Sequence, residues 1–152
     1  MANSYSKCRT NYFSVTDEAR FREIISNCSG EEVCVLIQSE KDKSKFGFYC
    51  SCNFSGLMEA EDKEMCESCD DKTCYDCINM DSDGALDYLY EELQKILPAG
   101  EAVIITEIGS EAMRYLSADC IIITKDEIRG LVLSDLALSA AREMLGNPEF
   151  TA

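Results

Sequence analysis

The sequence predicts an α+β fold, a largely antiparallel sheet with helices packed on one face, interrupted by a cysteine-rich metal-binding insertion. Its apolar residues alternate between strand-like and helix-like spacing in the order β-α-β-β-insertion-α-β-β-β-β-α. This periodicity stops between Ser55 and Ser82, a stretch too long for an ordinary connection. The length of 152 residues suits one domain, residues 1–152, with an acidic, cysteine-rich insertion at about 55–82.

The first helix is predicted to follow a short strand and to end before a glycine. Asn11–Val15 reads as a short strand, and Thr16 after it is a candidate N-cap. The helix ends before Gly30, and its apolar face consists of Phe21, Ile24, Ile25 and Cys28.

A hairpin is predicted next. Val33–Gln38 is a β-branched run, and the polar residues Ser39–Lys45 form the turn. In the following strand, alternate residues fall on one face, namely Phe46, Phe48, Cys50, Cys52 and Phe54. This alternation favours Cys50 and Cys52 as small buried residues, although the strand leads towards the insertion and could lend it a thiol.

The second half predicts two further helices around four strands. Asp83 is the candidate N-cap of a helix that Pro98 stops, with an apolar face made by Leu86, Leu89, Tyr90, Leu93, Ile96 and Leu97. Ser134 is the candidate N-cap of the last helix, and Gly146 ends it. The predicted strands between them are Ala102–Ile108, Ala112–Ala118, Cys120–Thr124 and Ile128–Leu133.

Composition excludes several classes of function. The formal net charge of −15 argues against direct binding to nucleic acid or to an anionic membrane. The chain has no histidine, which excludes Ser-His-Asp and Cys-His catalysis and histidine-containing zinc enzymes. No phosphate-binding glycine loop is present. The polar start and the lack of a long apolar run predict a cytoplasmic protein, where thiols more often bind metal, pack or sense redox state than form disulfides.

The segment MCESCDDKTCYDC carries the most specific motif. Its two C-x-x-C pairs are separated by four residues and present Cys66, Cys69, Cys74 and Cys77. Four such sulfurs suit a tetrahedral zinc ion at about 2.3 Å. Few large apolar residues lie nearby, so metal binding would supply folding free energy of the order of 10 kcal/mol. With four cysteine ligands the zinc would be structural, while a redox switch, an iron–sulfur cluster and free thiols remain alternatives.

Negative charge is concentrated around these cysteines. Residues 59–92 contain 13 acids against two lysines, a net −11 of the −15 of the whole chain. A four-cysteine zinc centre would add about −2. Such a segment would resemble a phosphate backbone to a basic groove, although a merely solvated surface is the plainer alternative. The predicted partner contacts are Glu59, Glu61, Asp62, Asp70 and Asp71. Paired-carboxylate catalysis is disfavoured, because these acids lack the apolar setting that separates two pKa values.

The stretches NYFSVTDEARFREII and LALSAAREMLGNPEF, with LYEELQKILPAGEAVIITEIG between them, carry a resemblance. They resemble small single-domain proteins from phages and integrative elements of gut bacteria, over roughly two thirds of the chain and not over Ser55–Ser82. The resemblance implies a mobile-element accessory protein. Small acidic proteins of such elements include anti-CRISPR and anti-restriction inhibitors, many of which imitate nucleic acid. It assigns no functional residues.

Three hypotheses of function follow. The first is a non-enzymatic inhibitor of the anti-CRISPR or anti-restriction type, whose acidic surface occupies a basic nucleic-acid-binding channel of a host defence protein. The second is a cytosolic zinc- or redox-responsive binding module that acts through its C-x-x-C thiols. The third is a structural protein of a mobile element, with the insertion only decorating its surface.

Overall fold

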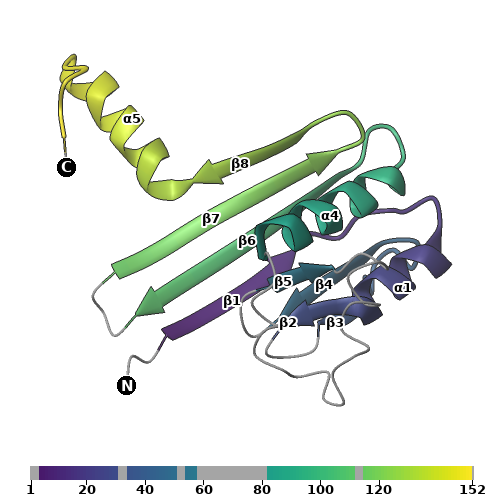
Figure 1. Ribbon diagram of the computed structural model, residues 1–152. Helices are drawn as coiled ribbons and strands as arrows, with labels where there is room; N and C mark the ends of the chain where they lie inside the picture. The colour runs from purple at the N-terminus through teal and green to yellow at the C-terminus, as the bar shows by residue number, and fades with distance from the viewer. Residues whose placement is uncertain (1–3, 31–33, 51–53, 58–81, 112–114, 152) are drawn as a thin grey trace.

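The computed structural model describes residues 4–30, 34–50, 54–57, 82–111 and 115–151 (Figure 1). Within these ranges the fold is α+β, as predicted. The elements in chain order are β1 (Ser4–Thr10), α1 (Glu18–Asn27), β2 (Cys28–Gly30), β3 (Val35–Gln38), β4 (Phe46–Cys50), β5 (Phe54–Leu57), α4 (Ser82–Lys95), β6 (Ala102–Glu111), β7 (Tyr115–Thr124), β8 (Ile128–Val132) and α5 (Leu133–Leu145).

Six strands form one antiparallel sheet in the order β3-β4-β1-β6-β7-β8. The strand β1 pairs with β4 on one side and with β6 on the other, so the first strand of the chain joins its two halves. A separate antiparallel pair consists of β2 and β5. The prediction of a largely antiparallel sheet is confirmed.

The core lies between the sheet and the helices α1 and α4, which share one face (Figure 1). At its centre the fully buried ring of Phe21 meets Phe13 edge-on, with centroids 5.5 Å apart. The rings of Phe46 and Phe48 in β4 lie 6.0 and 6.3 Å from Phe21. Burying this aromatic cluster removes a large apolar area from water and attaches α1 to the sheet.

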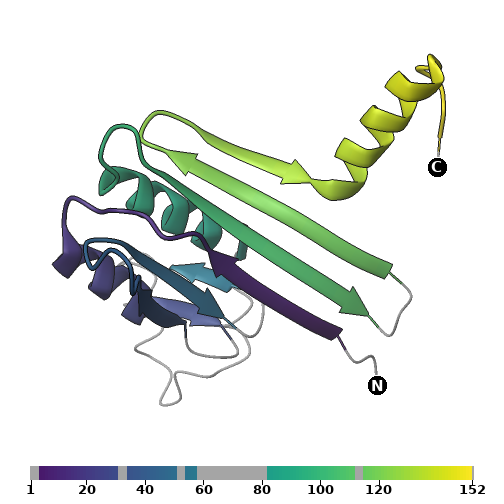
Figure 2. The same ribbon diagram turned by 180° about the vertical axis from the view of Figure 1, so that it is seen from behind.

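The opposite face of the sheet has no described helix over it (Figure 2). The helix α5 does not join α1 and α4, because it leaves the end of β8 and extends beyond the sheet (Figures 1 and 2). The prediction that helices pack on one face therefore holds for α1 and α4 and is wrong for α5.

The predicted strand Asn11–Val15 is wrong. These residues form a loop whose strand-like contact is an isolated bridge between Phe13 and Phe46. The Asn11 side chain fixes the loop, donating to the carbonyl of Ala102 at 3.0 Å and accepting from the amide of Ile104 at 2.7 Å. The first strand is instead β1, which precedes this loop. The sequence analysis missed it because its residues are mostly polar, as expected for a strand with one face in solvent.

The N-terminus of α1 lies one residue later than predicted. Asp17 is the N-cap, and its carboxylate accepts a hydrogen bond from the amide of Arg20 at 2.9 Å. The Thr16 hydroxyl instead donates to the carbonyl of Ile96 at 3.1 Å. Thr16 therefore attaches the loop to the end of α4. The predicted apolar face of α1 is confirmed for Phe21, Ile24 and Ile25, which are buried, whereas Cys28, also buried, lies past the end of the helix in β2.

The predicted turn at residues 39–45 does connect β3 to β4, and Phe46, Phe48 and Cys50 are buried as the alternation requires. Cys52 lies outside the described residues. The helix α4 begins at Ser82, so Asp83 lies inside it and does not precede it. Its predicted apolar face is confirmed, with Leu89 and Leu93 buried and Leu86 and Tyr90 partly buried. Ile96 and Leu97 are buried too, just past the last residue of the helix.

Two predicted strands near the C-terminus are one. In place of Ala112–Ala118 and Cys120–Thr124, a single strand β7 pairs with β6 from Tyr115 to Thr124. The predicted N-cap Ser134 is wrong as well, since β8 passes directly into α5 and Val132 occupies the cap position. Gly146 ends α5 as predicted, with φ +60°, a left-handed conformation that glycine adopts without strain. Among the described helices, none combines the length and apolar character needed to cross a membrane.

Candidate functional site

The predicted site residues all lie outside the described ranges. This applies to the candidate zinc ligands and to the candidate partner contacts, which are Cys66, Cys69, Cys74, Cys77, Glu59, Glu61, Asp62, Asp70 and Asp71. They stay predictions. The structure does describe the two elements that flank them, β5 and α4, and these two elements are in contact (Figure 1). The acidic segment therefore connects two elements that contact one another.

The acids of α4 divide into two groups. Asp87 and Glu91 are exposed. Glu92 is only 7% exposed, and its carboxylate accepts from Arg20 of α1 at 2.7 Å and from Lys95. Burial opposes ionisation of Glu92, yet the hydrogen bonds from Lys95 and Arg20 hold its pKa below the ordinary value. Glu92 therefore joins the two helices and does not belong to the free acidic surface.

Beneath the helices, the fold gathers four cysteines that no sequence motif connects. Cys8, Cys28, Cys34 and Cys50 are all buried in the core. Cys8 of β1 lies directly opposite Cys50 of β4, and the thiol of Cys34 interacts with those of Cys28 and Cys50. The burial of Cys50 was predicted from alternation. The clustering of the four cysteines was not predicted, because it depends on the pairing of β1 with β4, which local spacing does not reveal.

Two of these thiols, those of Cys8 and Cys34, are held in the protonated form. A hydrogen bond with Cys28, followed by burial, raises the pKa of Cys34. Burial also raises the pKa of Cys8, with a further contribution from the nearby Glu107. A protonated thiol is neither a good nucleophile nor a metal ligand. Within the described residues, no three cysteine or acidic side chains are arranged to hold a metal ion. In this arrangement the four cysteines serve as packing residues.

A pair of carboxylates lies beside the thiols. Glu107 of β6 is directly opposite Asp119 of β7, and strand alternation puts its side chain on the same face of the sheet as the buried Ile105. Burial, and then the charge of Asp119, raise the pKa of Glu107. Burial, followed by Cys8 and Glu107, also raises the pKa of Tyr90 to about 12. The sequence analysis missed this pair because the two acids meet through the register of a hairpin.

The carboxylate pair does not line the hollow found along β1 and β6. That hollow, of about 350 Å³, lies along β1 and β6 and is lined by Lys7, Arg9 and Asn11 together with Ile104, Thr106 and Ile108. Among them, the exposed side chains of Lys7, Arg9, Ile104 and Ile108 stand on the opposite face of the sheet from Glu107. A general acid must reach its substrate within hydrogen-bond distance, and the sheet separates the two here.

Comparison of the chain with known protein families, with curated proteins and with solved structures finds no match.

Proposed function

We propose that the chain is a non-enzymatic inhibitor of the anti-CRISPR or anti-restriction type. Its acidic segment would occupy a basic nucleic-acid-binding channel of a host defence protein, and a structural zinc held by Cys66, Cys69, Cys74 and Cys77 would order that segment. The observation that carries the proposal is the concentration of charge, a net −11 within residues 59–92. A dense array of carboxylates can replace the phosphates that a basic channel attracts.

The scaffold supports this proposal at the two ends of the segment. The two elements that flank the segment, β5 and α4, contact one another, so the scaffold would anchor the segment on both sides. The exposed Asp87 and Glu91 extend the negative surface onto α4. The negative charge of Glu92 is compensated by Arg20 and Lys95, so this carboxylate contributes to stability instead.

The test compares two variants with the same change in charge. Glu59→Lys/Glu61→Lys/Asp62→Lys reverses acids of the segment. The control, Glu40→Lys/Asp126→Lys/Glu149→Lys, reverses three exposed acids on other parts of the chain. The assay is the inhibition of DNA binding by purified CRISPR effector complexes and restriction enzymes, at low and at raised salt.

We expect wild type and control to inhibit at least one of these effectors, and the segment variant to inhibit at least about tenfold less, a difference of about 1.4 kcal/mol. Raised salt should weaken inhibition by the wild type, because it screens charges on the surface. Equal inhibition by the two triple variants would overturn the proposed role of the segment.

A second candidate function is a zinc- or redox-responsive binding module, which the four clustered thiols of the C-x-x-C pairs favour. Metal content of protein purified without chelator separates the alternatives. We expect one zinc per chain, absent in Cys66→Ser/Cys69→Ser and retained in Cys120→Ser, whose half-buried thiol lies 3.5 Å from the Thr106 hydroxyl in the sheet. A metal-free wild type that reversibly loses thiols under mild peroxide, and changes its binding as it does so, would favour the redox module over a zinc-ordered inhibitor.

A further inference from the structure

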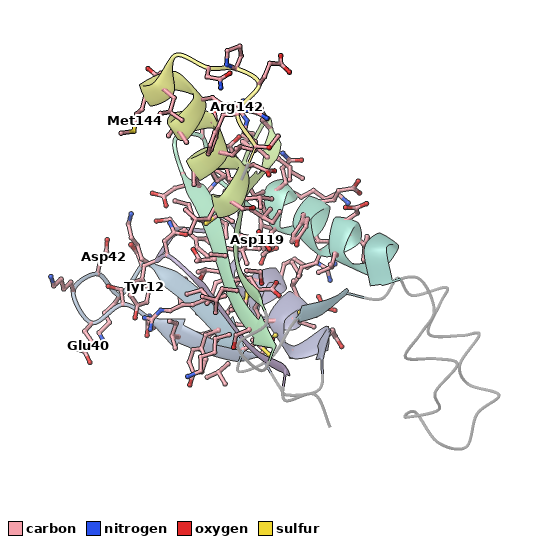
Figure 3. All side chains as sticks on the ribbon, turned by 90° about the vertical axis from the view of Figure 1, so that its left-hand side faces the viewer. Tyr12, Glu40, Asp42, Asp119, Arg142 and Met144 are labelled. Carbon is pink, nitrogen blue, oxygen red and sulfur yellow. The ribbon has the colours of Figure 1, made fainter. Side chains whose placement is uncertain are left out.

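The C-terminal helix α5 exposes the side that an amphipathic helix normally buries. None of its residues is buried. Leu133, Leu136 and Met144 are 59%, 50% and 86% exposed, and Ala137 and Ala140 between them are exposed too. These five positions follow helical spacing, so they form one apolar stripe along the helix. Figure 3 shows Met144 pointing away from the rest of the molecule.

The way α5 begins keeps it from folding back over its own sheet. The strand β8 ends at Val132 and the helix starts at Leu133, so no residue is left for a turn between them. A short connection of a few residues is what usually returns a helix onto the strand before it. Because it is absent, α5 extends beyond the sheet in both views (Figures 1 and 2).

A second apolar surface lies on the open face of the sheet. Ile104 and Ile108 of β6 and Leu116 of β7 are 39%, 59% and 77% exposed. In each of these strands they alternate with the residues that face α1 and α4, so they point to the face without a described helix. Ile122 and Leu131 on that face are half-buried. Figure 2 shows this face of β6, β7 and β8 free of described helices.

Charge restricts the partner that could cover the stripe of α5. The helix carries Asp135, Arg142 and Glu143, a net −1, whereas most of the charge of the chain lies in residues 59–92. A basic partner would be drawn to those acids and not to α5. A membrane-surface helix needs several cations on its polar face, and α5 has Arg142 alone. The stripe therefore suits a nearly neutral apolar surface. The open face of β6, β7 and β8 in this chain is such a surface, because its exposed cation Arg129 is paired with Glu127.

We propose that two copies of the chain form a symmetric dimer in which the α5 stripe of each copy lies on the open face of β6, β7 and β8 of the other. A helix of this length is about 20 Å long and 10 Å wide, so packing half of its surface removes about 300 Å² from water. In the symmetric dimer each copy buries one side of its helix and an equal area of its sheet face, about 600 Å² per copy. The two copies together then bury about 1,200 Å², which is the lower end of the range for specific, stable interfaces.

Sedimentation equilibrium of the purified full chain at micromolar concentration tests the dimer. We expect a mass twice the 17.0 kDa of one chain. Leu136→Lys on the stripe and Ile108→Glu on the open face should each weaken the dimer at least about tenfold, because each buries an unpaired charge twice in the symmetric pair. Ser139→Lys, on the polar side of the same helix, should leave the dimer intact.

Mixing the two weakened variants tests which surfaces meet. A mixed pair of Leu136→Lys and Ile108→Glu retains one unaltered helix-on-face contact and places the lysine and the glutamate together at the other. We therefore expect the mixture to dimerise more tightly than either variant alone. Circular dichroism should show all variants folded, because neither altered side chain belongs to the buried core.

Three results would overturn the proposal. They are a monomeric wild type at micromolar concentration, a dimer that persists in both variants, and variants that are weakened but not rescued on mixing, which would place α5 against another surface. The effect of added salt also distinguishes the dimer proposal from the inhibitor proposal. Salt should leave the dimer unchanged or strengthen it, whereas it should weaken binding through the acidic segment.

Discussion

Leu93→Ala and Leu136→Ala remove the same atoms from two amphipathic helices, yet we expect their effects on stability to differ severalfold. Leu93 in α4 is 0% exposed, and Leu136 in α5 is 50% exposed. Truncating a fully buried leucine costs about 2–5 kcal/mol, because a cavity adds to the lost transfer free energy. At Leu136 the loss is about half of the roughly 1.5–3 kcal/mol of full burial, or about 1 kcal/mol, with no enclosed cavity.

Urea unfolding followed by circular dichroism measures both changes in the free energy of unfolding. The comparison is made in dilute protein, where a dimer dissociates, and repeated in concentrated protein. The cost of Leu93→Ala should be the same at both concentrations. The cost of Leu136→Ala should rise with concentration if α5 forms the proposed dimer contact. Equal costs for the two variants in dilute protein would refute the reasoning, because α5 would then pack within its own chain as tightly as α4 does.

Three further predictions concern single side chains. Glu92→Gln should lower the free energy of unfolding by about 1–2 kcal/mol, because it removes a buried charge that two cations contact. Glu23→Gln, which loses an exposed ion pair with the same arginine, should cost less than about 0.5 kcal/mol in the same urea titrations. Glu107→Gln should stabilise the protein at neutral pH, since the raised pKa means that ionisation is less favourable in the folded chain than in the unfolded one. That gain should disappear in melts below the pKa of an unfolded glutamate, about 4.3, and a gain that persists there would contradict the electrostatic cause. Gly47→Ala should cost about 1–3 kcal/mol, because its new Cβ would lie 2.9 Å from a backbone oxygen. Gly130→Ala, with its nearest atom at 3.5 Å, should change the melting transition little.

Part of the fold was predictable because its signals are local. The apolar faces of α1 and α4 follow from helical spacing, and the residues expected there are buried or partly buried. The hairpin of β3 and β4 and the glycine that ends α5 follow from alternation and from backbone freedom. The strand β1 was missed because its inward positions hold Cys8 and Thr10, which do not form an apolar pattern.

The site was less predictable, because its groups meet through pairing between distant strands. Glu107 and Asp119 are opposite one another only once the register of β6 and β7 is fixed. Cys8 meets Cys50 through the pairing of β1 with β4. In contrast, the C-x-x-C pairs and the acidic run can be recognised directly in the amino-acid sequence, and their function stays a prediction.

The α+β class, the helical faces, the concentration of charge and the motif of four cysteines could be read from the amino acids alone, because each depends on residue type and short-range spacing. Which apolar face finds a partner within the chain depends on the three-dimensional arrangement. The helices α4 and α5 have similar patterns, but α4 packs onto the sheet and buries Leu89 and Leu93, whereas α5 follows β8 directly, extends beyond the sheet and leaves Leu133 and Leu136 exposed. Burial depends on where the preceding connection directs a helix, and periodicity carries no information about that direction.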